Sequence, residues 1–230
     1  MRCLFFDTGP IINLTLNNLL WVLGAMNKRF KGKFCITPGV KAELIDRPLN
    51  SRKFSFEALQ IIRALRKDYM TVFEDKTIRK RALELMNIAN KIYSAHGRPI
   101  QILHYAEMES LVAALKYKAD ALVVDERTLR VIIEKPGDLA SLLRRRLHTN
   151  ISVNKIELQK FNSEVGSLRL IRSAELVTVA YELGILDLYV PSGMANGRRK
   201  LLDSLLWAFK LNGCAITRRE IDDLLRLSKS

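Results

Sequence analysis

The amino-acid sequence predicts an α/β protein, a three-layer α/β/α sandwich around a central parallel sheet. Residues 3–6 and 121–124 form short, unbroken apolar runs, which are typical of strands buried on both faces of a parallel sheet. Between such runs, apolar residues recur at helical spacing, as in Met108, Leu111, Val112 and Leu115. Strands that alternate with helices favour a parallel sheet covered by helices on both faces.

The predicted elements follow one another along the whole chain. Pro10 suits the first turn of a helix, and Thr37-Pro38 starts another. Strands are expected at 3–6, 34–36, 70–73 and 121–124, and helices at 10–30, from 38, within 50–65, at 78–93, from 105, at 129–147 with a break at Pro136-Gly137, and within 175–230. Residues 150–158 and 168–171 are expected to pair as a hairpin. We therefore predict a domain of residues 1–150, with 151–230 as a β-hairpin and helical C-terminal extension packed on it.

Composition excludes several classes of protein. The chain has 230 residues, of which 48% are apolar, enough for one large core. Its apolar runs are far shorter than the roughly 20 residues of a membrane-spanning helix, so no membrane partner and a cytoplasmic location are expected. Three cysteines and three histidines without metal-ligand spacing argue against a disulfide framework and a zinc site.

The net charge of +14 indicates a polyanionic partner, and nucleic acid is the obvious one. The basic residues occur in short groups, of which Arg144, Arg145 and Arg146 are one example. Any single group is more often a solvated face than a binding site. Together they favour a nucleic-acid-binding protein.

Two acidic residues follow directly after predicted strands. Asp7 comes after the strand at 3–6, and Asp125 comes after the strand at 121–124. The carboxyl ends of parallel strands line the crevice where ligands bind, so both acids are candidate site residues. The alternative is that each acid only caps the helix that follows it.

Three glutamates are further candidates. Glu43 lies early in the helix after the second strand, where a solvent-facing position is the alternative. Glu107 and Glu109 lie on one predicted helix, and two positions correspond to about 200° around its axis. Only one of these two can join a cluster with Asp125.

The order of these acids resembles that of the PIN-domain family of metal-dependent nucleases. The matching stretches are FFDTGPIINL with Asp7, TPGVKAEL with Glu43, and AEMESLVAALKYKADALVVDE with Glu107 and Asp125. The resemblance covers roughly residues 1–130. The later stretches SAELVTVAYELGILDLY and LLDSLLWAFKLNGCAITRREIDDLLRL look like the helical end of one PIN subgroup, and residues 131–171 have no counterpart.

This chain departs from the family pattern at two positions. Glu107 stands where the family commonly has aspartate, and Glu126 follows Asp125 where a Thr or a second Asp is common. The spacing favours Glu107 over Glu109 for the family's position.

The resemblance implies an endoribonuclease of PIN-like fold that cuts single-stranded RNA. Asp7, Glu43, Glu107 and Asp125 are then the catalytic residues and ligands of Mg²⁺ or Mn²⁺, hard cations that favour carboxylate oxygens. Glu109 and Glu126 are further candidate ligands. Clustered carboxylates repel one another, and a cation neutralises that repulsion.

Arginines beside the acids are the expected contacts for RNA phosphates. Arg127 and Arg130 are i, i+3 neighbours if the chain is helical from Arg127 on. The alternative is that they pair with Glu126 or Glu134 as surface charges. Arg144, Arg145 and Arg146 form a second candidate path for the RNA.

Within the resemblance, the protein is either the toxin of a toxin/antitoxin pair or an RNA-processing nuclease. An antitoxin protein and a second copy of the chain are the expected protein partners. The alternative from another class is a non-catalytic, basic RNA-binding or scaffold protein on the same fold.

Overall fold

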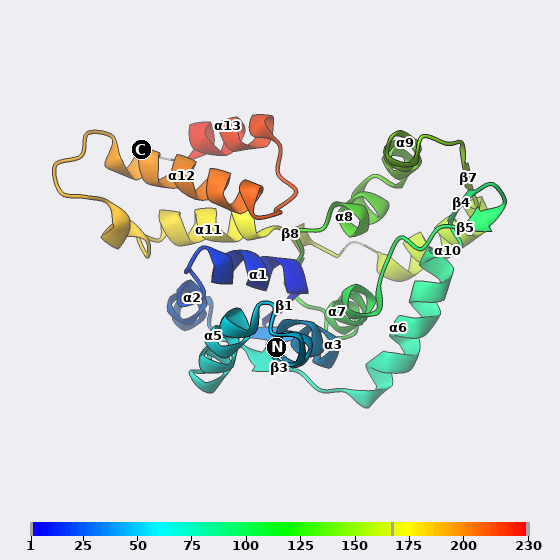
Figure 1. Ribbon diagram of the computed structural model, residues 1–230, viewed down its shortest axis with the longest axis horizontal. Helices are drawn as coiled ribbons and strands as arrows, with labels where there is room; N and C mark the ends of the chain where they lie inside the picture. Colours follow the sequence, from blue (N-terminus) through cyan, green and yellow to red (C-terminus); the bar gives the residue numbers. More distant parts are fainter. Residues whose placement is uncertain (1, 167, 229–230) are drawn as a thin grey trace.

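The computed structural model describes residues 2–166 and 168–228 (Figure 1). Its central sheet has five parallel strands. Their order is β3-β2-β1-β6-β8, so the first strand of the chain is the central one. The strands are β1 (Cys3–Phe6), β2 (Lys33–Ile36), β3 (Thr71–Val72), β6 (Ala121–Val123) and β8 (Leu170–Ile171). The predicted parallel central sheet is confirmed.

Helices cover both faces of this sheet. Leu4 and Phe6 of β1 belong to one buried core, and Cys3 and Phe5 to the other, because successive strand residues point to opposite faces. The first core includes α1 (Thr8–Leu16), α2 (Val22–Phe30), α5 (Ser55–Arg66), α11 (Ser173–Glu182), α12 (Gly197–Leu211) and α13 (Arg218–Leu227). The second includes α6 (Lys76–Ala89), α7 (Tyr105–Lys116), α8 (Arg127–Glu134), α9 (Pro136–Leu147) and α10 (Lys155–Val165). The predicted break at Pro136 separates α8 from α9.

The single helix predicted for residues 10–30 is two helices. Helix α1 ends at Leu16, and α2 begins at Val22. Asn18 between them has a φ of 55°, in the left-handed region that asparagine tolerates better than most residues. The apolar periodicity continues through both helices, so it could not reveal this turn.

The hairpin predicted from residues 150–158 and 168–171 is wrong. Strand β7 (Ile151–Val153) pairs with β4 (Tyr93–Ala95), and β4 also pairs with β5 (Arg98–Pro99) in a separate antiparallel sheet near α9 and α10 (Figure 1). Strand β8 instead pairs with β6.

Asn154 starts helix α10 because its side chain accepts hydrogen bonds from the first-turn amides of Ile156 and Glu157. The division of the chain at residue 150 stays a prediction, although each sheet contains strands from both sides of it.

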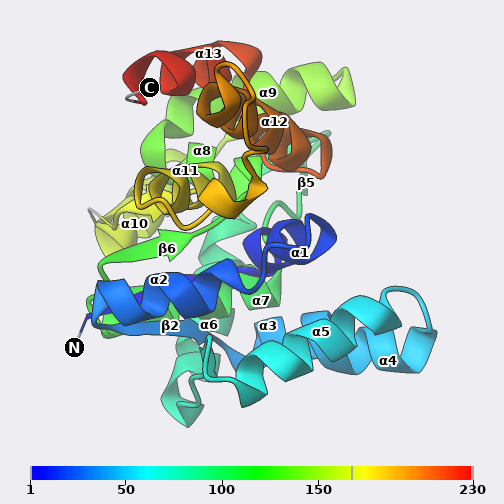
Figure 2. The same cartoon turned by 90° about the vertical axis from the view of Figure 1, so that its left-hand side faces the viewer.

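A run of short helical elements follows β2. These are α3 (Pro38–Lys41), the π-helical turn η1 (Ala42–Asp46) and α4 (Arg47–Ser51), and a 3₁₀ turn η2 (Asp187–Tyr189) precedes α12. Figure 2 shows α4 and α5 side by side, projecting below α1. Among the described residues, no helix combines the length and the apolar composition needed to cross a membrane.

Candidate active site

Adjacent parallel strands bring Asp7 and Asp125 to the same edge of the sheet. In the pairing of β1 with β6, Phe6 lies opposite Val123, and the N–H of Asp7 donates to the carbonyl of Val123 at 3.0 Å. The two acids therefore leave neighbouring strands at their carboxyl ends, as the sequence predicted. Both are buried, with 4% and 3% of their surfaces exposed.

Hydrogen bonds from two helices hold the Asp125 carboxylate. Its Oδ2 accepts from Asn13 Nδ2 and from Ser173 Oγ, both at 2.6 Å, and its Oδ1 accepts from the backbone N–H of Ser173 at 2.8 Å. The N–H of Ser173 belongs to the first turn of α11, where the helix dipole favours a negative charge. The alternative that Asp125 caps α8 is wrong, because Glu126 does so by accepting from Leu129 N at 2.8 Å.

Asn13 and Ser173 are the site residues that sequence reasoning missed. Asn13 carried a detectable signal, since it is a polar residue between the apolar Ile11 and Leu14 and is buried in the structure. Ser173 carried none, because it lies 48 positions from Asp125.

Asp7 is a buried carboxylate with an unsatisfied oxygen. It occupies the N-cap position of α1 without a side-chain capping hydrogen bond, and its Oδ1 has no hydrogen-bond partner among the described residues. Burial raises the pKa of Asp7 to about 7; the Thr8 amide opposes this rise, whereas the carboxylates of Glu43, Asp125 and Glu126 add to it. Because an orphaned buried carboxylate oxygen is costly, this position favours a cation or a proton.

Glu107 shares the electrostatic environment of Asp7. It lies in the first turn of α7, where Oε2 accepts from the backbone N–H of His104 at 3.0 Å. Burial raises the pKa of Glu107 to about 8, the His104 amide opposes the rise, and the carboxylates of Asp7, Glu126 and Glu43 add to it. The candidates Asp7 and Glu107 are therefore close enough to repel each other.

Glu43 approaches the same group from the π-helical turn η1. Its Oε2 accepts from Thr8 Oγ1 at 2.7 Å, and Oε1 accepts from Arg47 at 3.3 Å. The side chain is 26% exposed, so the alternative of a fully solvent-facing glutamate does not apply. Such π-helical turns recur at functional sites, where the extra residue in the turn redirects a side chain.

Glu109 has a different role. Its Oε2 accepts from the backbone N–H of Gly39 at 2.6 Å and its Oε1 accepts from Tyr105 Oη at 2.6 Å, which ties α7 to the start of α3. A Cβ at position 39 would lie 2.7 Å from Oε2, so a larger residue there would displace the Glu109 carboxylate from this position. Both oxygens of Glu109 are engaged inside the protein, unlike those of Asp7.

These acids form a repelling group rather than a closed metal cage. Across residues 2–166 and 168–228, no three His, Cys, Asp or Glu side chains are already gathered closely enough to hold a metal ion. The orphaned Oδ1 of Asp7 and the raised pKa values of Asp7 and Glu107 nevertheless fit a hard divalent cation, because it would neutralise the repulsion.

A basic groove of ≈ 1030 Å³ begins beside Asp125. One wall is the connection between α12 and α13, where the N–H of Ala215 donates to the carbonyl of Asp125 at 3.2 Å. The cationic side chains that line the groove are Arg127, Arg130, Lys135, Arg145, Arg172 and Lys210. Its acidic side chains are Glu134, Asp138 and Glu220.

The structure separates the five candidate RNA-binding arginines. Arg127 and Arg145 are exposed and line the groove, whereas Arg144 and Arg146 are exposed on the same helix as Arg145 without lining it. Arg130 also lines the groove, but it pairs with Glu134 at 3.3 Å, as the surface-charge alternative anticipated. Arg127 and Arg145 are thus the strongest of the predicted phosphate contacts.

No family model, curated protein or solved structure matches this chain. The resemblance to the PIN-domain family therefore stays a proposal that depends on the residues themselves.

The first prediction concerns stability in the presence of a chelator. In the folded protein the pKa values of Asp7 and Glu107 are about 7 and about 8, against ordinary values of 3.8 and 4.5. Both carboxyl groups favour folding most when they are protonated, below about pH 4. This contribution to the free energy of unfolding is lost as the pH rises to about 8. Asp7→Asn should raise the free energy of unfolding at pH 8 by at least about 1.4 kcal/mol, the equivalent of one pKa unit. Urea denaturation across this pH range measures it. Equal stability of variant and parent at pH 8 would contradict it.

The second prediction separates the two glutamates of α7. Glu107→Gln should lower any metal-dependent activity about 100-fold or more while leaving stability unchanged or higher, because it removes a repelled charge. Glu109→Gln should cost about 1–3 kcal/mol of stability, because it weakens a charged hydrogen bond inside the protein. Activity and thermal unfolding of both variants, measured side by side, test the assignment. The reverse ranking would exchange the roles of the two residues.

Proposed function

We propose that the chain is a cytoplasmic, PIN-like endoribonuclease that hydrolyses phosphodiester bonds of single-stranded RNA with Mg²⁺ or Mn²⁺. The observation that supports this most is the group formed by Asp7, Glu43, Glu107 and Asp125, which come from four different structural elements and interact at one edge of the sheet. The raised pKa values of Asp7 and Glu107 are typical of functional acids rather than of surface carboxylates. The toxin and the RNA-processing roles both use this reaction.

The four carboxylates would hold the cation, which when bound supplies an acidified water and neutralises charge on the phosphate. Asn13 and Ser173 keep the Asp125 carboxylate in one orientation by hydrogen bonds to both its oxygens. Thr8 does the same for one oxygen of Glu43. Preorganised groups of this kind need little rearrangement during the reaction.

The basic groove supplies what the acidic group lacks, an attraction for a polyanion. Arg127 follows Asp125 by two residues, and Arg145 on α9 lines the same groove. Contacts from arginine to phosphates position a strand without reading its sequence. Cys214, which also lines the groove, is kept protonated, because burial raises the pKa of its thiol to about 12; a nucleophilic thiolate is therefore not part of this proposal.

The third prediction tests the reaction itself. A labelled single-stranded RNA should be cut in Mg²⁺ or Mn²⁺ and spared in chelator, and Asp7→Asn should abolish the cutting while the protein stays folded. Gel analysis of the RNA, with circular dichroism of the variant as the fold control, measures both. Binding of RNA without cutting in any of these cations would favour the non-catalytic scaffold instead, and an active Asp7→Asn protein would remove Asp7 from the site.

The fourth prediction tests the groove. Arg127→Gln with Arg145→Gln should weaken binding to all RNAs alike and reduce the slope of affinity against salt concentration by about two, one per lost phosphate contact. The matched control is Arg144→Gln with Arg146→Gln, which removes the same charge outside the groove. Fluorescence anisotropy in Ca²⁺, chosen to suppress turnover, gives the slopes. Equal slopes for the two double variants would place the RNA elsewhere.

A further inference from the structure

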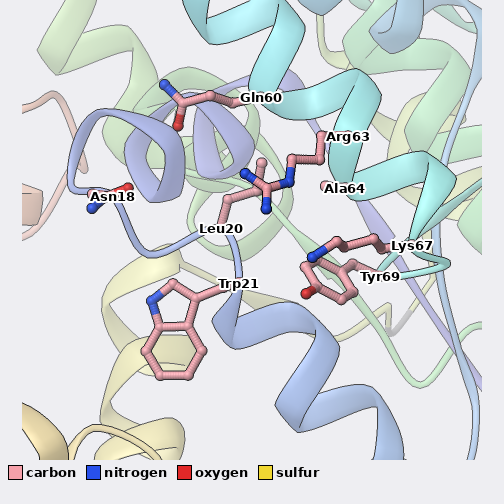
Figure 3. A pocket seen from close by; sticks show the side chains of 8 residues that line it. All are labelled: Asn18, Leu20, Trp21, Gln60, Arg63, Ala64, Lys67 and Tyr69. Carbon is pink, nitrogen blue, oxygen red and sulfur yellow. The ribbon is translucent and has the colours of Figure 1, made fainter.

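A second cavity lies away from the acids, between the α1–α2 turn and helix α5 (Figure 3). Its volume is ≈ 250 Å³. Six of its lining side chains carry the chemistry, namely Asn18, Trp21, Gln60, Arg63, Lys67 and Tyr69. Pockets that enclose whole small molecules usually span about 300–1,000 Å³, so this one suits a single unit of a longer ligand.

The cavity has positive charge without a counter-charge. Its lining contains Arg63 and Lys67 and no acidic residue. Neither cation forms an ion pair with any residue of 2–166 or 168–228. Figure 3 shows the Arg63 side chain reaching from α5 over the cavity toward Leu20. Two unpaired cations beside one cavity favour an anionic ligand.

Two aromatic rings flank these cations and are held in place. The Tyr69 ring packs on α2 where Gly24 leaves room, since a Cβ there would lie 2.3 Å from its Cε1. A glycine inside a helix costs about 0.5–1 kcal/mol relative to alanine, and here it admits the ring. Lys67 Nζ lies 6.0 Å from the centre of Tyr69, and the Trp21 ring lies 6.4 Å from that of Tyr189.

Two amide side chains complete the cavity. In the described structure the side chains of Asn18 and Gln60 take part in no hydrogen bond with protein. Each offers donors and an acceptor, which is the combination that pairs with the edge of a nucleobase. Aromatic faces for a base, cations for a phosphate and free amides for base edges are the parts of a site for single-stranded nucleic acid.

The length of helix α1 separates the cavity from the acids. Helix α1 begins beside Asp7 and, with nine residues at about 1.5 Å each, ends about 13 Å away at the cavity. A smaller hollow between α1 and α5 is lined by Glu43, Leu16 and Ile61 among others.

We propose that this cavity binds one nucleotide of a single-stranded RNA at a distance from the acids. The base lies against Trp21 and Tyr69, and Arg63 and Lys67 contact its phosphate. The inference rests on the proposed ribonuclease function only for the identity of the strand, because binding here needs neither metal nor cleavage.

The fifth prediction tests this site by binding in chelator. In a Trp207→Phe background, Trp21 is the remaining tryptophan, and its emission should be quenched by a short oligoadenylate but not by an abasic strand of equal length. Arg63→Gln with Lys67→Gln should weaken oligoadenylate binding about tenfold or more, the loss expected for a charged hydrogen bond. Both residues are exposed, so the fold should tolerate the changes.

The matched control is Lys53→Gln with Arg66→Gln, which removes the same charge from exposed positions outside the cavity. Equal losses for the two double variants, or a Trp21 emission that saturating oligoadenylate leaves unchanged, would overturn the proposal. Equal quenching by adenosine monophosphate and by the oligomer would also overturn it, in favour of a site for free nucleotides. If the protein cuts RNA but Trp21 emission does not respond, only the nucleotide-binding cavity is ruled out. If Trp21 emission responds but RNA is not cut, only the nuclease function is ruled out.

Discussion

Much of this structure depends on the hydrogen bonds that hold the buried carboxylate of Asp125. A buried charge is tolerated only when hydrogen bonds replace the water it has lost. Here the donors come from Asn13 on α1 and from Ser173 at the start of α11, so one side chain fixes the sheet, an early helix and a late helix relative to one another. The carbonyl of Asp125 also accepts from Ala215, which positions the wall of the basic groove. The last third of the chain is therefore built into the site.

The carboxylates of the candidate site and the cations of the groove and the cavity lie in different parts of the structure. Burial, with a smaller contribution from repulsion by neighbouring carboxylates, raises the pKa values of Asp7 and Glu107 to about 7 and about 8. Among the described residues, Arg127 in the groove and Arg63 in the cavity form no ion pair. A polyanion is attracted to these cations and repelled by the carboxylates, unless a cation or protons neutralise the acids.

Neighbouring acids on one helix serve unlike purposes because of helical geometry. Glu107 and Glu109 point in nearly opposite directions from α7. One direction leads to the carboxylates at the end of β1, and the other leads to the Gly39 amide at the start of α3. Fixing α3 through Glu109 also helps to fix Glu43, because the π-helical turn η1 continues directly from α3.

The sequence by itself determined the parallel sheet and most of the helices, because buried strands and helices have distinct apolar periods. It also determined the two acids at the ends of β1 and β6, because residues that follow neighbouring parallel strands lie at one edge of the sheet. It also determined the basic character of the chain. It did not determine the turn after Leu16, the pairing of β7 with β4 or of β8 with β6, or the role of Ser173, because strand partners and hydrogen-bond donors far apart in sequence leave no local pattern. Tertiary structure also decided which of Glu107 and Glu109 faces the acids and which arginines line the groove. The exposure and direction of a helix side chain depend on what the helix packs against.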